Sequence, residues 1–361
     1  MAVRSDTIFV AANVFPLQGD SLMARPAYLG RLRQNDAGDL VALAPLDLPP
    51  GDFQFAYPRI IPAGGRLHLV WGEFGSLPRT TAAWPPSRVM SLWHAVLDSR
   101  SWSAPEKIAT AYSFGWNDQT GDVAVDASGA LHVAAWKGDT GSIPRVHDFR
   151  LAGGQWESSS LPYTGFNQAT AIATRGDTVV IALVDEARDT ARVMIIESTD
   201  YGTHWTNPIV ASWRPRSQGS VSHLAFGTTA DGLLLAIGEK ANDSFYLDTI
   251  RVLRLNGAPG RSTPQFVTPP PTADQFVLAG TSCGSVVMLT RNFSFNLQIF
   301  QVTIPRDSSG AVTRPLLSTA GFSASPGVAA GRRSAIAVFA YNTAAGEPGR
   351  SAAMTLPVCS P

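Results

Sequence analysis

Short apolar runs, each ending in a turn and followed by polar residues, repeat along the whole chain. Residues 57–61 turn at Ala63-Gly64-Gly65 into the run 67–73, and residues 122–125 turn at 126–129 into 131–137. Four later hairpins repeat the pattern, at 170–184, 221–237, 276–290 and 327–341. The period is about 50 residues, within the range typical of propellers and other arrays. No stretch sustains a helical period, so the pattern predicts an all-β protein.

A second signal recurs in the outer half of these units. Three successive units place a tryptophan, Trp102, Trp156 and Trp205, at the same point of an outer hairpin. The turn before the third is the most specific, because Ser198 and Asp200 can bond backbone N–H groups there and Gly202 permits a positive φ. Trp205 is expected to fold back over this turn as an apolar plug.

The spacing Ser198-x-Asp200-x-Gly202-x-x-Trp205 resembles the Asp-box (BNR) turn of sialidase-like β-propellers. In that superfamily the turn joins the outer two strands of a blade. The resemblance covers nearly the whole chain as architecture, and it implies a bacterial protein that is secreted or periplasmic, although the chain shows no export signal.

These patterns together predict one β-propeller domain over residues 1–361, built from four-stranded antiparallel blades. Counting second strands indicates seven blades, and counting inner strands indicates six, the number in sialidases. With either number, the N- and C-terminal segments must meet to close the ring. The two cysteines, Cys283 and Cys359, are either free thiols or one bridge that ties the C-terminus to the body.

Composition narrows the classes of partner. The chain has 28 Lys+Arg and 28 Asp+Glu, so no net field attracts nucleic acid or an acidic membrane. No run approaches the roughly 20 apolar residues of a membrane-spanning helix, so we expect no membrane insertion. Neither a phosphate-binding loop nor metal-ligand spacing is present, and His68 and His132 occupy equivalent positions in two second strands, which favours packing over metal binding. We therefore expect no cofactor and no metal, and the sequence does not indicate an oligomeric state.

Candidate functional residues follow from blade geometry. In four-stranded blades, the loops after the second strands and those between blades emerge on one face, the channel face, where propellers bind their ligands. Charged residues at strand ends are also common simply because they are solvated. The candidates for catalysis on this face are Glu73, Asp139, Glu239 and Tyr341, and those for ligand binding are Trp84, Trp116, Asp118, Lys137, Arg188, Arg214 and Arg291; the resemblance to sialidases adds Arg59 as a ligand-binding candidate.

The sialidase site itself is only weakly represented. Sialidases hold the substrate carboxylate with three arginines, the first in a Phe/Tyr-Arg-Ile-Pro motif. The segment Tyr57-Pro58-Arg59-Ile60-Ile61-Pro62 is similar but has an inserted proline, so only Arg59 corresponds. The loop 74–88, where the resemblance would place an acid/base Asp, contains none. It does contain Trp84, which can cover a pocket, stack on a sugar or pack on the neighbouring blade.

The sequence therefore predicts a propeller that engages a glycan or another polar small molecule on its channel face. A glycoside hydrolase would need two carboxyl groups roughly 5 to 9.5 Å apart across the sugar. The alternative is a non-catalytic, lectin-like or protein-interaction propeller. The sequence does not choose between these two classes.

Overall fold

The computed structural model describes residues 2–4, 7–13, 27–34, 40–51, 56–74, 88–98, 101–113, 121–137, 145–163, 167–186, 189–229, 232–241, 244, 246–255, 265–269, 273–281, 286–292, 296–304, 312–320, 326–330, 334–341 and 350–357. Apart from turns and one short 3₁₀ helix, Arg216–Gln218, the regular structure of these residues is β-strand. They contain no helix with the length and hydropathy that a bilayer crossing requires. Cys283 and Cys359 lie outside them.

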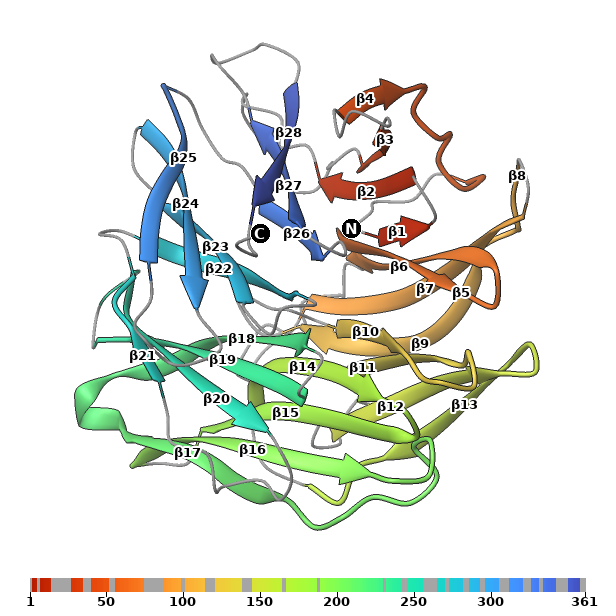
Figure 1. Ribbon diagram of the computed structural model, residues 1–361. Coiled ribbons are helices and arrows are strands. Elements are labelled where there is room, and N and C mark those ends of the chain that lie inside the picture. Colours follow the sequence, from red (N-terminus) through yellow and green to blue (C-terminus); the bar gives the residue numbers. More distant parts are fainter. Residues whose placement is uncertain are drawn as a thin grey trace. The chain divides into compact units, whose positions relative to one another are not determined.

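The chain divides into two compact units. One unit comprises Ser21–Leu29 and Leu46–Trp213 and contains three successive sheets (Figure 1). The first of these sheets consists of β5 (Ala56–Ala63), β6 (Arg66–Phe74), β7 (Arg88–Asp98), β8 (Ser101–Trp102) and β9 (Glu106–Ser113). The next has β10 (Gly121–Val125), β11 (Leu131–Lys137), β12 (Arg145–Ala152) and β13 (Gln155–Ser160). The third has β14 (Asn167–Arg175), β15 (Thr178–Glu186), β16 (Thr190–Ser198) and β17 (Ile209–Pro215), whose last two residues, Arg214 and Pro215, belong to the other unit.

The other unit comprises Met1–Asp20, Gly30–Pro45 and Arg214–Pro361. Most of one sheet comes from the start of the chain: β1 (Ala2–Arg4), β2 (Thr7–Asn13), β3 (Ala27–Gln34) and β4 (Leu40–Leu43). Two four-stranded sheets follow: β18 (Ser220–Thr229), β19 (Gly232–Lys240), β20 (Leu247–Leu255) and β21 (Gln265–Val267), then β22 (Ala273–Gly280), β23 (Val286–Asn292), β24 (Asn296–Ile304) and β25 (Val312–Ala320). The last sheet has β26 (Pro326–Ala330), β27 (Ser334–Tyr341) and β28 (Arg350–Pro357).

The predicted four-stranded antiparallel propeller blades are confirmed, but their predicted number is not. Among the described residues, five sheets have four strands, one has three and one has five, so the expectation of six or seven such blades is wrong. The five-stranded sheet arises because β7 pairs with two separate strands, with β8 through Leu97 and Asp98 and with β9 along residues 88–94. In the last sheet, no described strand pairs with β28 on its outer side.

The prediction of a single domain with a closed ring remains a prediction. One contact bears on it within the unit that holds both ends of the chain. Ile8 of β2 and Ile336 of β27 share one buried cluster, against which Ala353 of β28 packs. The first and last sheets therefore touch through apolar side chains.

The middle of four second strands, β6, β11, β15 and β19, is buried on both faces. All nine residues of β19 are buried, and so are residues 179–184 of β15. Because both faces of such a strand are buried, its sequence is a continuous apolar run rather than an alternating one. Each fully buried Leu or Ile contributes about 1.5 to 3 kcal/mol to folding, so these strands form the core of each unit.

The turn after β16 is closed by side chains, as expected from its sequence. The amides of Gly202 and Asp200 donate to Ser198 Oγ at 2.8 and 3.4 Å, and this hydroxyl donates to Asp200 Oδ1 at 2.7 Å. The same carboxylate oxygen accepts from the His204 amide at 2.8 Å. Gly202 has a φ of 81°, in the region where glycine is strain-free. Trp205 does fold back onto the core, but it is half-buried rather than enclosed, and its Nε1 donates to Ser159 Oγ of β13 at 3.2 Å.

Gly202 covers a buried charged network in the neighbouring sheet. His132 of β11 is fully buried, with Nδ1 2.9 Å from Asp148 Oδ2 and Nε2 3.1 Å from Asp126 Oδ2. Burial opposes the charge on His132, but the two carboxylates outweigh it and raise the pKa of His132 above its ordinary value. A Cβ at Gly202 would lie 2.7 Å from Asp148 Oδ2. The turn therefore needs glycine for both its φ and its close approach to this network.

We expect Gly202→Ala to destabilise the protein more than Gly154→Ala, the matched control. Gly154 has nearly the same φ, 83°, but a Cβ there would meet nothing within 4 Å. The control should lose about 1 to 2 kcal/mol of unfolding free energy from backbone strain alone. Gly202→Ala should lose roughly 2 kcal/mol more from overpacking against Asp148. Equal losses in urea titrations of the two variants would show that the turn does not press on the network.

Candidate functional site

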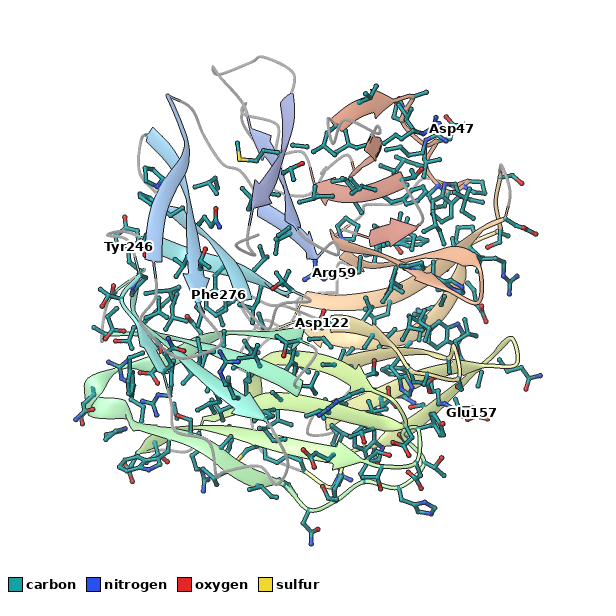
Figure 2. The ribbon with its side chains drawn as sticks, viewed as in Figure 1. Asp47, Arg59, Asp122, Glu157, Tyr246 and Phe276 are labelled. Atoms are coloured by element: carbon teal, nitrogen blue, oxygen red, sulfur yellow. The ribbon has the colours of Figure 1, made fainter. Side chains whose placement is uncertain are left out.

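Inner strands of three sheets lie side by side in the unit that contains β5–β17. Strand β10 contacts β5 on one side and β14 on the other. Arg59 of β5 and Asp122 of β10 face each other across the first of these contacts, with Arg59 Nε 3.9 Å from Asp122 Oδ1 (Figure 2). Their side chains are 32% and 29% exposed, so a ligand can reach both.

Asp122 is held in place by backbone donors. Its Oδ1 accepts from the Val123 amide at 3.0 Å, and its Oδ2 accepts from the Ile172 amide of β14 at 3.2 Å. Burial raises the pKa of Asp122, while Arg59 and the two amides act in the opposite direction. One carboxylate thus hydrogen-bonds to the inner strands of two sheets and lies 3.9 Å from the arginine of a third.

Arg59 remains able to bind an anionic group. Its contact with Asp122 is made through Nε and is long, so the two terminal NH₂ groups can form paired hydrogen bonds elsewhere. A guanidinium matches the planar geometry of carboxylates and similar oxyanions. Asp122 beside it can accept a hydrogen bond from a hydroxyl. The pair is therefore suited to a ligand that carries an acidic group next to hydroxyls.

A second charged cluster, in the other unit, contains two predicted residues, Arg214 and Glu239. Arg214 donates through NH1 to Glu239 Oε2 at 3.4 Å and to Asp248 Oδ1 at 3.2 Å, and through NH2 to Asp248 Oδ2 at 3.0 Å and to the Gln218 carbonyl. Glu239 Oε1 lies 3.0 Å from Arg251 NH2. Burial raises the pKa of Glu239 against the opposing effect of its two arginines. Both predicted residues are engaged within the protein, and their roles in catalysis and ligand binding remain predictions.

The other predicted residues are placed as follows. Glu73, at the end of β6, is partly exposed and accepts from Trp93 Nε1 at 2.9 Å. Lys137 is partly exposed at the end of β11. For Arg291 on β23 and Tyr341 on β27, the structure gives the strand but not the side chain. Five predicted residues lie outside the described part of the chain: Trp84, Trp116, Asp118, Asp139 and Arg188.

Sequence reasoning missed Asp122, although the repeat contained the signal. Arg59 pairs with Val70, two residues after His68, and Asp122 pairs with Ala134, two residues after His132. The sequence analysis already places His68 and His132 at equivalent positions of two second strands. Applying the same alignment to the inner strands that pair with them places Arg59 and Asp122 at equivalent inner positions. Sequence reasoning also missed Trp93. Its Nε1 donates to Glu73, and it lies opposite Trp71 in the pairing of β6 with β7.

No family model and no curated protein matches the sequence. Among solved structures, an ulvan lyase from a new polysaccharide lyase family, PL25, is similar with a TM-score of 0.64 and 11% identity, over 99% of this chain and 91% of that one. The same lyase bound to -[GlcA(1-4)Rha3S]- matches equally well. Penicillium chrysogenum α-L-arabinanase complexed with arabinobiose matches with a TM-score of 0.52 and 12% identity, over 85% of this chain and 96% of that one. At these identities the likeness shows the propeller fold alone.

Among the described residues, no group of three or more His, Cys, Asp or Glu side chains is placed to hold a metal ion. The His132 network includes two carboxylates, but each is directed at the imidazole. His68 likewise contacts a second histidine, with Nδ1 2.9 Å from His94 Nε2.

We expect Arg214→Lys to destabilise the protein by about 1 to 3 kcal/mol, because a lysine ammonium cannot reproduce the paired bonds to Asp248 and the bond to the Gln218 carbonyl. The control is Arg192→Lys. Arg192 is 41% exposed and pairs with Asp185 at 2.8 Å, an ion pair that a lysine can keep. The control should therefore change stability by about 0.5 kcal/mol or less. Similar losses in both variants, measured by urea denaturation, would contradict a structural role for the Arg214 fork.

Proposed function

We propose that this propeller binds an acidic carbohydrate and that the Arg59–Asp122 pair contacts it. The observation that carries the proposal is a partly exposed guanidinium beside a partly exposed, backbone-anchored carboxylate on adjacent inner strands. Such a pair can take a sugar acid on the arginine and a neighbouring hydroxyl on the aspartate. The fold supports the same direction, since a similar structure is that of a lyase bound to a glucuronate-containing saccharide.

Such a propeller can bind the carbohydrate without changing it, or it can bind the carbohydrate and also cleave it. Hydrolysis of a glycosidic bond requires two carboxyl groups flanking that bond. Asp122 supplies one carboxyl in this unit, and Glu73, oriented by Trp93, is the second candidate. The alternative is a lectin-like propeller that binds without cleavage, and it would use the same arginine. Export to the periplasm or the medium, where such polysaccharides occur, belongs to the proposal as well.

Screening the purified chain on an array of acidic and neutral oligosaccharides tests this function. We expect retention of uronate-containing or sulfated glycans, and we expect Arg59→Ala to weaken it about 10- to 100-fold, because a charge-assisted bond contributes roughly 1.5 to 3 kcal/mol. Arg175→Ala is the control, since Arg175 is exposed at the turn between β14 and β15. Equal binding by wild type and Arg59→Ala, or retention of neutral glycans alone, would overturn the proposal.

Reading the same array after prolonged incubation distinguishes binding alone from binding followed by cleavage. Loss of a bound sugar in the wild type but not in Asp122→Asn would indicate cleavage that depends on this carboxyl. Binding without loss would indicate the lectin-like alternative.

A further inference from the structure

Two histidines lie in contact within the interface between sheet β5–β9 and sheet β10–β13. His68 of β6 and His94 of β7 are both buried, with His68 Nδ1 2.9 Å from His94 Nε2 and ring centroids 5.1 Å apart. His94 also meets the edge of Trp156 of β13 in the next sheet, again with centroids 5.1 Å apart. Around them, Val70 and Leu92 of one sheet pack with Leu131, Val133 and Phe149 of the other. The histidine pair is therefore part of the joint between these two sheets.

The neighbouring sheet has a different residue at the same place. His94 pairs across its sheet with Val70, two residues after His68, and Asp148 pairs with Ala134, two residues after His132. The first slot therefore holds His–His and the second holds His–Asp. In the second, carboxylates contact both nitrogens of the imidazole. In the first, among the residues that the structure describes, the carboxylate paired with His94 is Glu106 of β9, whose Oε2 is 3.8 Å from His94 Nδ1 and whose side chain is 55% exposed.

The hydrogen bond between His68 and His94 makes this pair sensitive to acid. In the tautomer that pairs the two rings, His68 Nδ1 accepts from His94 Nε2–H, and a hydrogen bond with the Ala63 backbone acts to raise the pKa of His68. This arrangement requires only that His68 Nδ1 carries no proton. A proton added to His68 Nδ1 removes the acceptor of the bond between the rings and so favours their separation. A proton added to His94 Nδ1 leaves that bond in place but puts a charge in an apolar joint, which burial opposes.

The charged groups near the pair do not compensate such a proton well. Arg66, at the start of β6, opposes a charge on either ring. Glu106 favours a charge on His94, but its exposed side chain is screened by water. From the β10–β13 side, the described contact is the uncharged Trp156. Burial, then the neighbouring His68 and Arg66, lower the pKa of His94 to about 3, and burial, then Arg66, lower the pKa of His68.

We propose that protonation of the His68–His94 pair opens the joint between these two sheets and so releases ligand from the Arg59–Asp122 pair in acid. The coupling is geometric, because Arg59 on β5 and Asp122 on β10 bridge the same two sheets as His94 and Trp156 do. Release of ligand rests on the proposed function, whereas opening of the joint does not. At the next joint, two carboxylates contact His132 and raise its pKa, so a proton there is stabilised rather than opposed.

The lowered pKa values of His68 and His94 determine that the joint opens as pH falls. A histidine whose pKa is lower in the closed joint than in the open one stabilises the closed form above the ordinary pKa, and this stabilisation is lost as pH falls. Between an ordinary value of 6.5 and a closed value of about 3 for His94, the open population should rise about tenfold per pH unit. At pH 4.5 it should be about a hundredfold larger than at neutral pH.

Hydrogen exchange, corrected for the intrinsic pH dependence of amide exchange, measures this opening without any ligand. We expect the amides of β9 and β11, and those of Val123 and Ile172 that donate to Asp122, to exchange about a hundredfold faster through opening at pH 4.5 than at pH 7. His94→Asp, which copies the pair of the next sheet, should reduce this ratio to about threefold or less. His94→Phe, which removes the titrating ring, is the second variant if the first does not fold.

The control is His204→Gln, because His204 is 86% exposed in a different turn, and it should behave as the wild type does. Unchanged exchange in the wild type at pH 4.5, or acceleration that persists in the folded His94 variant, overturns the proposed joint. Binding of a glucuronate-containing tetrasaccharide then tests the coupling. Binding lost in acid by the wild type and kept by the His94 variant supports it, and binding that survives in acid while the joint opens overturns it. If this probe binds at neither pH while the joint opens as expected, the proposed function fails and the acid-sensitive joint stands.

Discussion

Burial of the second strands β6, β11, β15 and β19 on both faces is the constraint on which the rest of this structure depends. Strand β19 has no exposed residue, and the middle of β15 is equally enclosed. A polar side chain can enter such an interface only with a partner, since an unpaired buried polar group costs on the order of 1 to 3 kcal/mol. The His132 network, the His68–His94 pair and the Arg214–Glu239 cluster each meet this requirement with different chemistry.

The inner strands are where this packing leaves polar groups within reach of a ligand. Asp122 accepts amides from its own strand and from β14, so its position is set by the backbone of two sheets. Arg59 contacts that carboxylate only through Nε, so its two NH₂ groups can still bind a ligand. In Arg214, by contrast, both NH₂ groups are hydrogen-bonded within the protein. This difference in remaining hydrogen-bonding capacity, rather than charge alone, distinguishes a binding arginine from a structural one.

The sequence was sufficient for the fold wherever local chemistry determines it. The apolar second strands, the glycine turns and the side-chain closure by Ser198 and Asp200 were predicted because each depends on residues close together in the chain. The number of four-stranded blades was not predicted correctly. It depends on which strands pair at the edge of a sheet, and the apolar pattern does not show that both β8 and β9 pair with β7. Arg59 was identified from a motif, whereas Asp122, 63 positions later, was missed because the equivalence of His68 and His132 was not extended to the inner strands that pair with them.

The central claim is that a sugar acid binds at Arg59 beside Asp122. A crystal structure of the chain with a glucuronate-containing oligosaccharide tests it most directly. The account predicts a sugar carboxylate within hydrogen-bonding distance of the terminal NH₂ groups of Arg59 and a sugar hydroxyl on Asp122. A saccharide bound instead at the Arg214–Glu239 cluster, or with its acid group pointing away from Arg59, would contradict it.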